Sequence, residues 1–189
     1  MSNFYHTLLY KRLGWSLDIS VELPDKCIFC VAPHTSNWDF IIGELYIRSI
    51  GKTANFLMKR EWFFWPLGIL LKRIGGIPVE RSHKTSLTDQ LAERAAQENT
   101  FRLAVTPEGT RSKVTIWKRG FYFIALKAQI PILLYTIDYK KKRIVCHKSI
   151  MPTGDVDADM RDIMNYYRPF ADNAKFPEKF AVEEITPNP

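Results

Sequence analysis

Apolar and polar positions follow two different periods along the chain. Short apolar runs rich in β-branched and aromatic residues are typical of buried strands. They occur at 27–32, 54–58, 77–79, 101–106, 131–139 and 143–148. Apolar residues at helical spacing lie between and after these runs, at 38–50, 61–74, 87–96, 117–129 and 156–170. This alternation predicts an α/β fold: a single domain with a mixed, mostly parallel β-sheet flanked by helices.

Two segments depart from this alternation. Residues 4–15 have the pattern of a short basic amphipathic helix, and the basic turn 139–143 predicts an antiparallel hairpin between two late strands. We therefore expect an N-terminal amphipathic segment at 1–20, the main globular domain at 21–176 and a loosely held tail at 177–189.

Charge adds a class of partner to this picture. The chain has 189 residues and a net charge of +7, but residues 1–150 hold 23 Lys and Arg against 12 Asp and Glu. A basic body indicates an anionic partner, such as phosphate esters, a membrane surface, an acidic carrier or nucleic acid. We expect no nucleic acid, because the aromatic residues cluster in apolar stretches and no recognition motif is present.

The N-terminal sequence, the longest apolar run and the cysteines indicate the cellular compartment. The N-terminus lacks a signal-peptide pattern, and the longest uncharged apolar run, residues 62–71, is too short to cross a bilayer. These features predict a cytoplasmic protein, with membrane contact only peripheral, at the inner face of the cell membrane. Three cysteines give no disulfide framework; Cys27 and Cys30 lie three apart in a strand pattern, on opposite faces, and predict no zinc site.

Candidate chemistry begins in the loop after the first apolar run. His34 has a side chain suited to proton transfer near neutral pH, and Asp39 stands five positions on, in the first turn of the next helix. A carboxylate at the second ring nitrogen would orient the imidazole and stabilise its cation. Ser36 and Asp39 also fit a capping box, so Asp39 has a purely structural interpretation as well.

A second loop follows the strand at 101–106. Pro107 and Gly109 predict a tight turn with exposed amides, and Arg111 offers a planar fork for phosphate or carboxylate oxygens. Glu108 and Thr110 complete this run. A solvated surface turn is the alternative interpretation.

Two further cations belong to the candidate site. Arg81 ends a short strand that follows the glycine pair at 75–76, and Lys59 ends the strand before it. Both also have the ordinary interpretation of solvated surface residues. The four histidines are scattered, and we expect no metal site and no cofactor.

Taken in order, these motifs resemble those of the glycerolipid acyltransferase family, which includes the bacterial 1-acylglycerol-3-phosphate acyltransferases. The matching residues are His34-x4-Asp39, Lys59-x-Glu61 with Pro66-x-Gly68, Gly76–Arg81, Pro107–Arg111 and Ile130-Pro131-Ile132. The resemblance runs from about residue 27 to 137 and implies a glycerol-3-phosphate acyltransferase-like fold. Pro33 and Thr106 depart from the family pattern, which often has Asn and Phe at these places.

The resemblance also implies an activity and roles. It implies an O-acyltransferase of phospholipid biosynthesis, with acyl-CoA or acyl carrier protein as the acyl donor and a lysophospholipid, first of all 1-acylglycerol-3-phosphate, as the acceptor. His34 would be the general base and Asp39 its partner. Arg81, Glu108, Gly109 and Arg111 would bind the acceptor with Thr110 beside them, and Lys59 would lie near the acceptor phosphate.

From these roles we expect direct transfer, with backbone amides near Gly109 and Thr110 stabilising the oxyanion. The aromatic stretch 62–71 between basic flanks fits either a bilayer interface or a core helix. A hydrolase using the same His and Asp, and a non-catalytic peripheral lipid-binding domain, are the alternatives.

Overall fold

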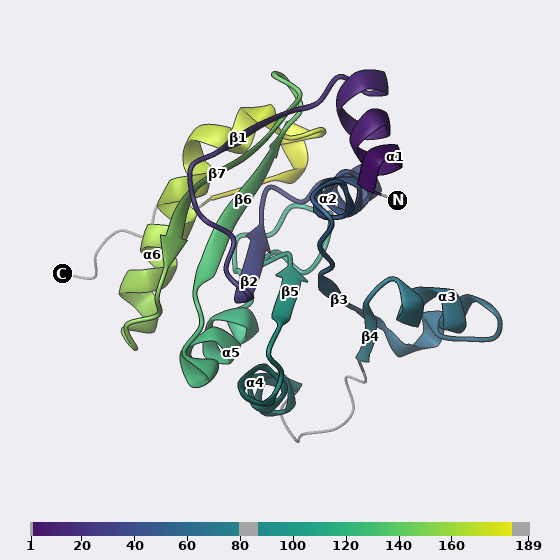
Figure 1. Ribbon diagram of the computed structural model, residues 1–189. Coiled ribbons are helices and arrows are strands. Elements are labelled where there is room, and N and C mark those ends of the chain that lie inside the picture. Colours follow the sequence, from purple (N-terminus) through teal and green to yellow (C-terminus); the bar gives the residue numbers. More distant parts are fainter. Residues whose placement is uncertain (1, 80–86, 183–189) are drawn as a thin grey trace.

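Seven strands form one sheet in the order β1-β7-β6-β2-β5-β3-β4 (Figure 1). The computed structural model describes residues 2–79 and 87–182. The strands are β1 (Ser16–Ile19), β2 (Lys26–Val31), β3 (Asn55–Lys59), β4 (Gly76–Val79), β5 (Phe101–Val105), β6 (Ile132–Asp138) and β7 (Arg143–Ile150). All neighbours are parallel except β6 and β7, which form the predicted antiparallel hairpin. The predicted mixed, mostly parallel sheet is confirmed.

Helices cover both faces of this sheet. They are α1 (Ser2–His6), α2 (Asn37–Ser49), α3 (Leu67–Arg73), α4 (Leu87–Gln97), α5 (Gly120–Ala128) and α6 (Val156–Tyr167). A π-helical stretch, Thr7–Arg12, continues α1, and short 3-10 turns lie at Arg60–Trp62, Arg168–Asn173 and Pro177–Lys179. One apolar core joins α4, α5 and α6 to the sheet, and a second joins α2 and the N-terminal helix to its other face.

The central strand β2 is buried because both of its faces lie in a core. Cys27 and Phe29 face the core under α2, whereas Ile28 and Cys30 face the core under α5 and α6. The two cysteines therefore lie on opposite faces, as predicted, and both are free thiols. Burial raises the pKa of the Cys27 thiol to about 12, which keeps the thiol protonated at neutral pH.

The connections that follow β2 and β5 leave the sheet on opposite faces, and this arrangement positions the site. β2 pairs with β5 in parallel, with Cys30 opposite Val105. The helix that follows β2 is α2, on one face, and the helix that follows β5 is α5, on the other. Adjacent parallel strands whose connections leave to opposite faces open a crevice at their carboxyl ends, the usual ligand position in such sheets.

Two element predictions need correction. The helix expected over 61–74 is limited to α3, preceded by the 3-10 turn Arg60–Trp62. Pro66 accounts for the difference, because proline lacks an N–H and disfavours helical backbone in the residue before it, so the helix starts after it. Strand β1 was not predicted; it pairs with β7, which lies more than a hundred residues further along the chain.

The C-terminal segment is packed further along than we predicted. Pro177–Lys179 forms a turn, and Phe180 is buried in the core with its ring 6.0 Å from that of Trp117. Residues 183–189 lie outside the described part of the chain.

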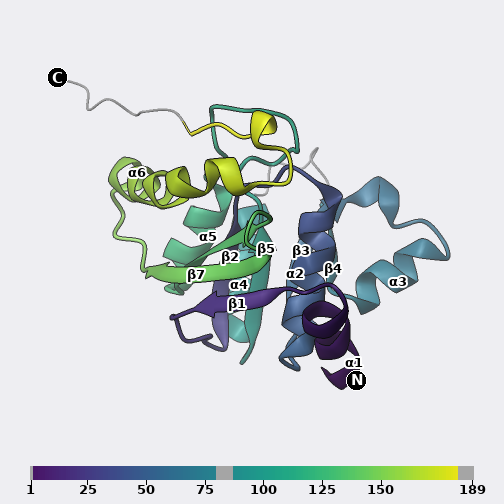
Figure 2. The same ribbon diagram turned by 90° about the horizontal axis from the view of Figure 1, so that it is seen from above.

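The connection between β3 and β4 projects from the edge of the sheet. It carries α3 and extends away from the other helices in both views (Figures 1 and 2). No helix within residues 2–79 and 87–182 combines the length and apolarity needed to cross a membrane.

Candidate active site

His34 and Asp39 meet at the start of α2, directly after β2. Nδ1 of His34 lies 3.2 Å from Oδ2 of Asp39, whose side chain is almost fully buried. Nδ1 lacks ideal hydrogen-bond geometry and finds no other partner among the described residues. Such contacts often tighten only when a substrate binds. Nε2 is left for a group in the cleft that His34 lines.

Asp39 also caps α2, so both interpretations of its sequence position apply. The backbone N–H groups of Thr35 and Ser36 each donate to Oδ2 at 2.9 Å, and Ser36 Oγ accepts from the Trp38 N–H at 3.2 Å. The cap holds the carboxylate in the orientation that reaches His34. The same hydrogen bonds therefore cap α2 and orient the Asp39 carboxylate toward the imidazole.

A third donor to Asp39 comes from a distant part of the chain. The hydroxyl of Tyr139, at the β6–β7 turn, donates to Oδ1 of Asp39 at 2.5 Å. Tyr139 was not predicted as a site residue, because it belongs to none of the motifs and lies a hundred positions from Asp39. The basic hairpin turn was the nearest signal, and it predicted only a change of direction.

Glu108 lies beneath the His34 loop. Its Oε1 accepts a hydrogen bond from the His34 backbone N–H at 2.7 Å, and the residue is 5% exposed. Burial raises the pKa of its carboxyl to about 7, while the His34 N–H acts in the opposite direction. Glu108 does not line the cleft. This position suits a residue that holds the His34 loop better than one that binds an acceptor.

The turn after β5 depends on Gly109. Its φ of +65° is left-handed, and a Cβ there would lie 2.5 Å from Cε of Lys118. The Gly109 N–H donates to the Thr106 carbonyl at 3.0 Å, so this amide is already used within the turn. The expected oxyanion role therefore does not fit Gly109. Within the described residues the Thr110 amide has no partner, and the Thr110 hydroxyl accepts from the Ser112 N–H at 3.3 Å.

A cleft of about 930 Å³ extends from these loops toward α2 and the sheet. Polar groups lie where the β2 and β5 loops line it: His34, Asn37, Arg111 and Lys118. Arg111 and Asn37 are exposed, and the Arg111 guanidinium donates to the Asn37 amide oxygen. The remainder is mostly apolar and includes Phe29, Tyr46, Ile47, Tyr135, Ile137 and Ile144. The arrangement joins an imidazole, cations and a mostly apolar cavity.

The structure leaves two predicted cations unassigned. Lys59 ends β3, opposite Val79 of β4, but only its backbone is described. Arg81 lies outside the described residues. Among the residues that the structure places, no three His, Cys, Asp or Glu side chains gather as a metal site would require.

Comparison with known proteins identifies the class. Residues 19–137 match the model of the Acyltransferase family, and the chain belongs to that family. The predicted family resemblance is thereby confirmed. Among curated proteins, the chain is similar to a 1-acyl-sn-glycerol-3-phosphate acyltransferase from Cocos nucifera, with 28% identity over 142 residues. That match covers 69% of this chain and 45% of the relative, so the chain spans about half the relative's length.

A solved structure shares the fold. It is the crystal structure of the 1-acyl-sn-glycerophosphate (LPA) acyltransferase, PlsC, from Thermotoga maritima, with a TM-score of 0.56 and 20% sequence identity. The match covers 88% of this chain and 80% of that chain, and it supports the predicted acyltransferase-like architecture.

Proposed function

We propose that this protein is an O-acyltransferase that moves a fatty acyl group from a thioester onto a hydroxyl of a lysophospholipid, in phospholipid biosynthesis. The observation that carries the proposal is the pairing of His34 with buried Asp39 where basic side chains and a long apolar cleft meet. The first candidate acceptor is 1-acylglycerol-3-phosphate, the substrate named for the Cocos nucifera relative.

His34 acts as the general base in this scheme. Nε2 takes the proton of the acceptor hydroxyl as that oxygen attacks the thioester carbonyl. The carbon–sulfur bond then breaks, and the imidazolium returns the proton to the leaving thiolate. Asp39 stabilises the imidazolium between these steps. The three cysteines are buried and none of them lines the cleft, so we assign none of them as a nucleophile. Direct transfer requires no such residue.

The two ends of the cleft suit the two parts of the substrates. Arg111 and Lys118 line it beside His34, where a phosphate bound by the guanidinium fork would hold the acceptor hydroxyl near the base. Lys59 and Arg81 remain proposed contributors to phosphate binding. The apolar part under α2 has the chemistry of an acyl-chain site. Acyl-CoA and acyl carrier protein are the proposed donors.

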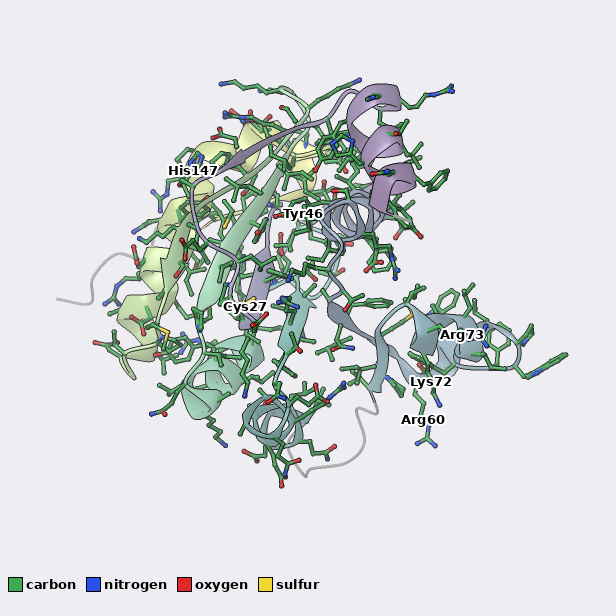
Figure 3. All side chains as sticks on the ribbon, viewed as in Figure 1. Cys27, Tyr46, Arg60, Lys72, Arg73 and His147 are labelled. Carbon is green, nitrogen blue, oxygen red and sulfur yellow. The ribbon has the colours of Figure 1, made fainter. Side chains whose placement is uncertain are left out.

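The α3 excursion, residues 60–75, supports a peripheral contact with an anionic membrane. Trp65 is 82% exposed, and four further apolar side chains are half-exposed or more: Trp62, Phe64, Ile69 and Leu70. Three cations, Arg60, Lys72 and Arg73, lie on the same projecting segment (Figure 3). Aromatic residues beside basic ones suit the interface of an anionic bilayer. Because Trp62 also lines the cleft, this surface would bring the cleft to the lipid.

The test is a thiol-release assay of the purified chain with palmitoyl-CoA and 1-acylglycerol-3-phosphate. We expect thiol release that depends on the acceptor and falls by about a hundredfold or more in His34→Ala, the usual range for a lost general base. His147→Ala is the matched control, because His147 also pairs with an aspartate, Asp18, at 2.7 Å, but on β7. Monoacylglycerol, which lacks the phosphate, should be a much weaker acceptor.

Other outcomes identify the alternatives. Thiol release that ignores the acceptor would indicate a hydrolase, and no release with retained lipid binding would indicate a binding domain. Near-normal transfer by His34→Ala would end the proposed mechanism.

A further inference from the structure

The pair His34–Asp39 is completed by residues that follow the family-matched region. That region ends at residue 137. Tyr139 lies just beyond it and reaches back to Asp39 with a hydroxyl-to-carboxylate distance of 2.5 Å. No motif or comparison gives this tyrosine a role.

The two oxygens of Asp39 have different surroundings. Oδ2 accepts from the Thr35 and Ser36 amides and faces Nδ1 of His34. Oδ1 accepts from Tyr139 and from no other donor in the described part of the chain. A carboxylate only accepts, so the phenol is the donor. Burial, together with the neighbouring Asp39 charge, raises the pKa of Tyr139 well above its usual value, which keeps the donor proton in place.

Two segments that are far apart in the sequence hold Tyr139 in position. The Tyr139 N–H donates to the Asn173 carbonyl at 2.9 Å, and its ring packs edge-to-face with that of Trp15, the ring centroids being 5.3 Å apart. The Lys175 ammonium lies 5.8 Å from the same ring. One residue further, the Phe176 N–H donates to Thr35 Oγ1 at 3.2 Å, which fixes the His34 loop to the C-terminal segment.

We propose that Tyr139 is a positioning residue for the reaction: it acts through Asp39 by withdrawing charge from the carboxylate, and so keeps His34 less basic than Asp39 alone would make it. A hydrogen bond to an anion disperses its charge and weakens its attraction for a neighbouring cation. Without this hydrogen bond, we expect Asp39 to hold an imidazolium more strongly. This inference rests on the proposed function of His34 as a base.

Other ionisable groups also surround His34, and the test must separate them from Tyr139. Glu108 contacts the His34 backbone and titrates near neutral pH, Arg111 and Lys118 line the cleft, and Lys175 lies over the Trp38 ring at 4.8 Å. A direct probe of the His34 ring is therefore needed beside the activity profile.

The experiment compares wild type with Tyr139→Phe, followed by NMR titration of the His34 ring and by the pH dependence of kcat. We expect the ring's titration midpoint and the acid limb of kcat to move upward together by roughly half to one pH unit, with KM unchanged. Tyr10→Phe is the matched control: Tyr10 contacts the same core cluster, but its hydroxyl pairs with Ser49 at 3.0 Å. It should move neither quantity.

A second replacement reverses the sign. Incorporating 3,5-difluorotyrosine at position 139 keeps the shape but strengthens the donor, so both quantities should move downward. A midpoint that stays fixed in both variants, or that moves in the same direction in both, would overturn the role of Tyr139. If wild type transfers no acyl group, the proposed function fails, whereas the NMR titration still decides whether Tyr139 tunes His34.

Discussion

Glu108 shows how one buried carboxyl couples the His34 loop to pH. It accepts from the His34 N–H, while its second oxygen, Oε2, is buried without a partner among the described residues. Protonating this carboxyl removes the penalty of burying a charge. The loop that carries His34 is therefore bound to a group that changes its charge near neutral pH.

The sign of the resulting pH effect follows from the raised pKa. The folded-state pKa of Glu108 is about 7, against 4.5 for an ordinary glutamate, so between these values the folded state holds a proton that the unfolded state loses. The contribution of Glu108 to the free energy of unfolding is therefore largest below pH 4.5 and is lost as pH rises to about 7. Glu108→Gln cannot ionise. We expect urea unfolding to show a flatter pH dependence in the variant, and at pH 8 a gain on the order of 3 kcal/mol.

A surface carboxyl serves as the comparison. Glu93→Gln, on the exposed side of α4, should leave the slope of wild type unchanged. If Glu108→Gln keeps the wild-type slope between these pH values, Glu108 does not carry this proton.

At the scale of elements, α2 has two functions: its first turn holds Asp39, and its body forms a wall of the cleft. Gly43 lies in this wall, and a Cβ at this position would meet no atom within 4 Å. Glycine inside a helix costs about 0.5–1 kcal/mol relative to alanine. Its presence leaves room in the cleft beside the sheet.

Filling this room tests whether the cleft holds the acyl chain. In Gly43→Leu we expect kcat/KM for palmitoyl-CoA to fall about tenfold relative to octanoyl-CoA, because the added side chain occupies space that only the longer chain needs. Gly43→Ala should raise the thermal midpoint and keep the wild-type preference. An unchanged preference in Gly43→Leu would place the acyl chain elsewhere.

Local patterns identified most elements because those elements bury a regular face. α2 and β2 were predicted within a residue or two for this reason. β1 was missed because four residues with a mixed burial pattern give little periodicity, and its partner is distant in sequence. The helix at 61–74 was wrong in extent because Pro66 delays its start, and the apolar residues that suggested a longer helix, such as Trp65 and Leu70, face solvent.

At the scale of the whole molecule, the parallel order of β2 and β5 made the site partly predictable. Residues after two such strands must meet at one edge, which is why His34, Asp39 and Glu108 come together as the sequence indicated. Tyr139 and Asn173 could not be predicted in the same way. Their positions depend on how the hairpin and the C-terminal turns pack, which no local pattern encodes.

The projecting α3 excursion gives a prediction for the whole molecule. We expect the protein to sediment with vesicles containing phosphatidylglycerol more than with neutral phosphatidylcholine vesicles, and Trp65→Ser to weaken this binding about tenfold through lost apolar contact. Replacing both Lys72 and Arg73 by glutamate should remove the preference for anionic lipid.

Met151 provides the control for this surface. Its side chain is also exposed, but it follows β7, which runs antiparallel to β6. The end of β7 therefore lies at the opposite end of the strands from the His34 loop. Met151→Ser should bind vesicles as wild type does. Equal loss in the two serine variants, or no lipid preference in wild type, would count against the α3 excursion as the contact.

The contacts that position Tyr139 also have a consequence for the order in which the site can form during synthesis. The segments that hold His34 and Glu108 are synthesised before Asn173 and Phe176, because translation runs from the N-terminus. Until those residues are made, the contacts that hold Tyr139 against Asp39 cannot form, even though the residues of β2 and β5 are already in the chain. Loss of the residues from Asn173 onward would therefore remove the carbonyl that accepts from the Tyr139 N–H, although His34, Asp39 and Tyr139 would all remain in the chain.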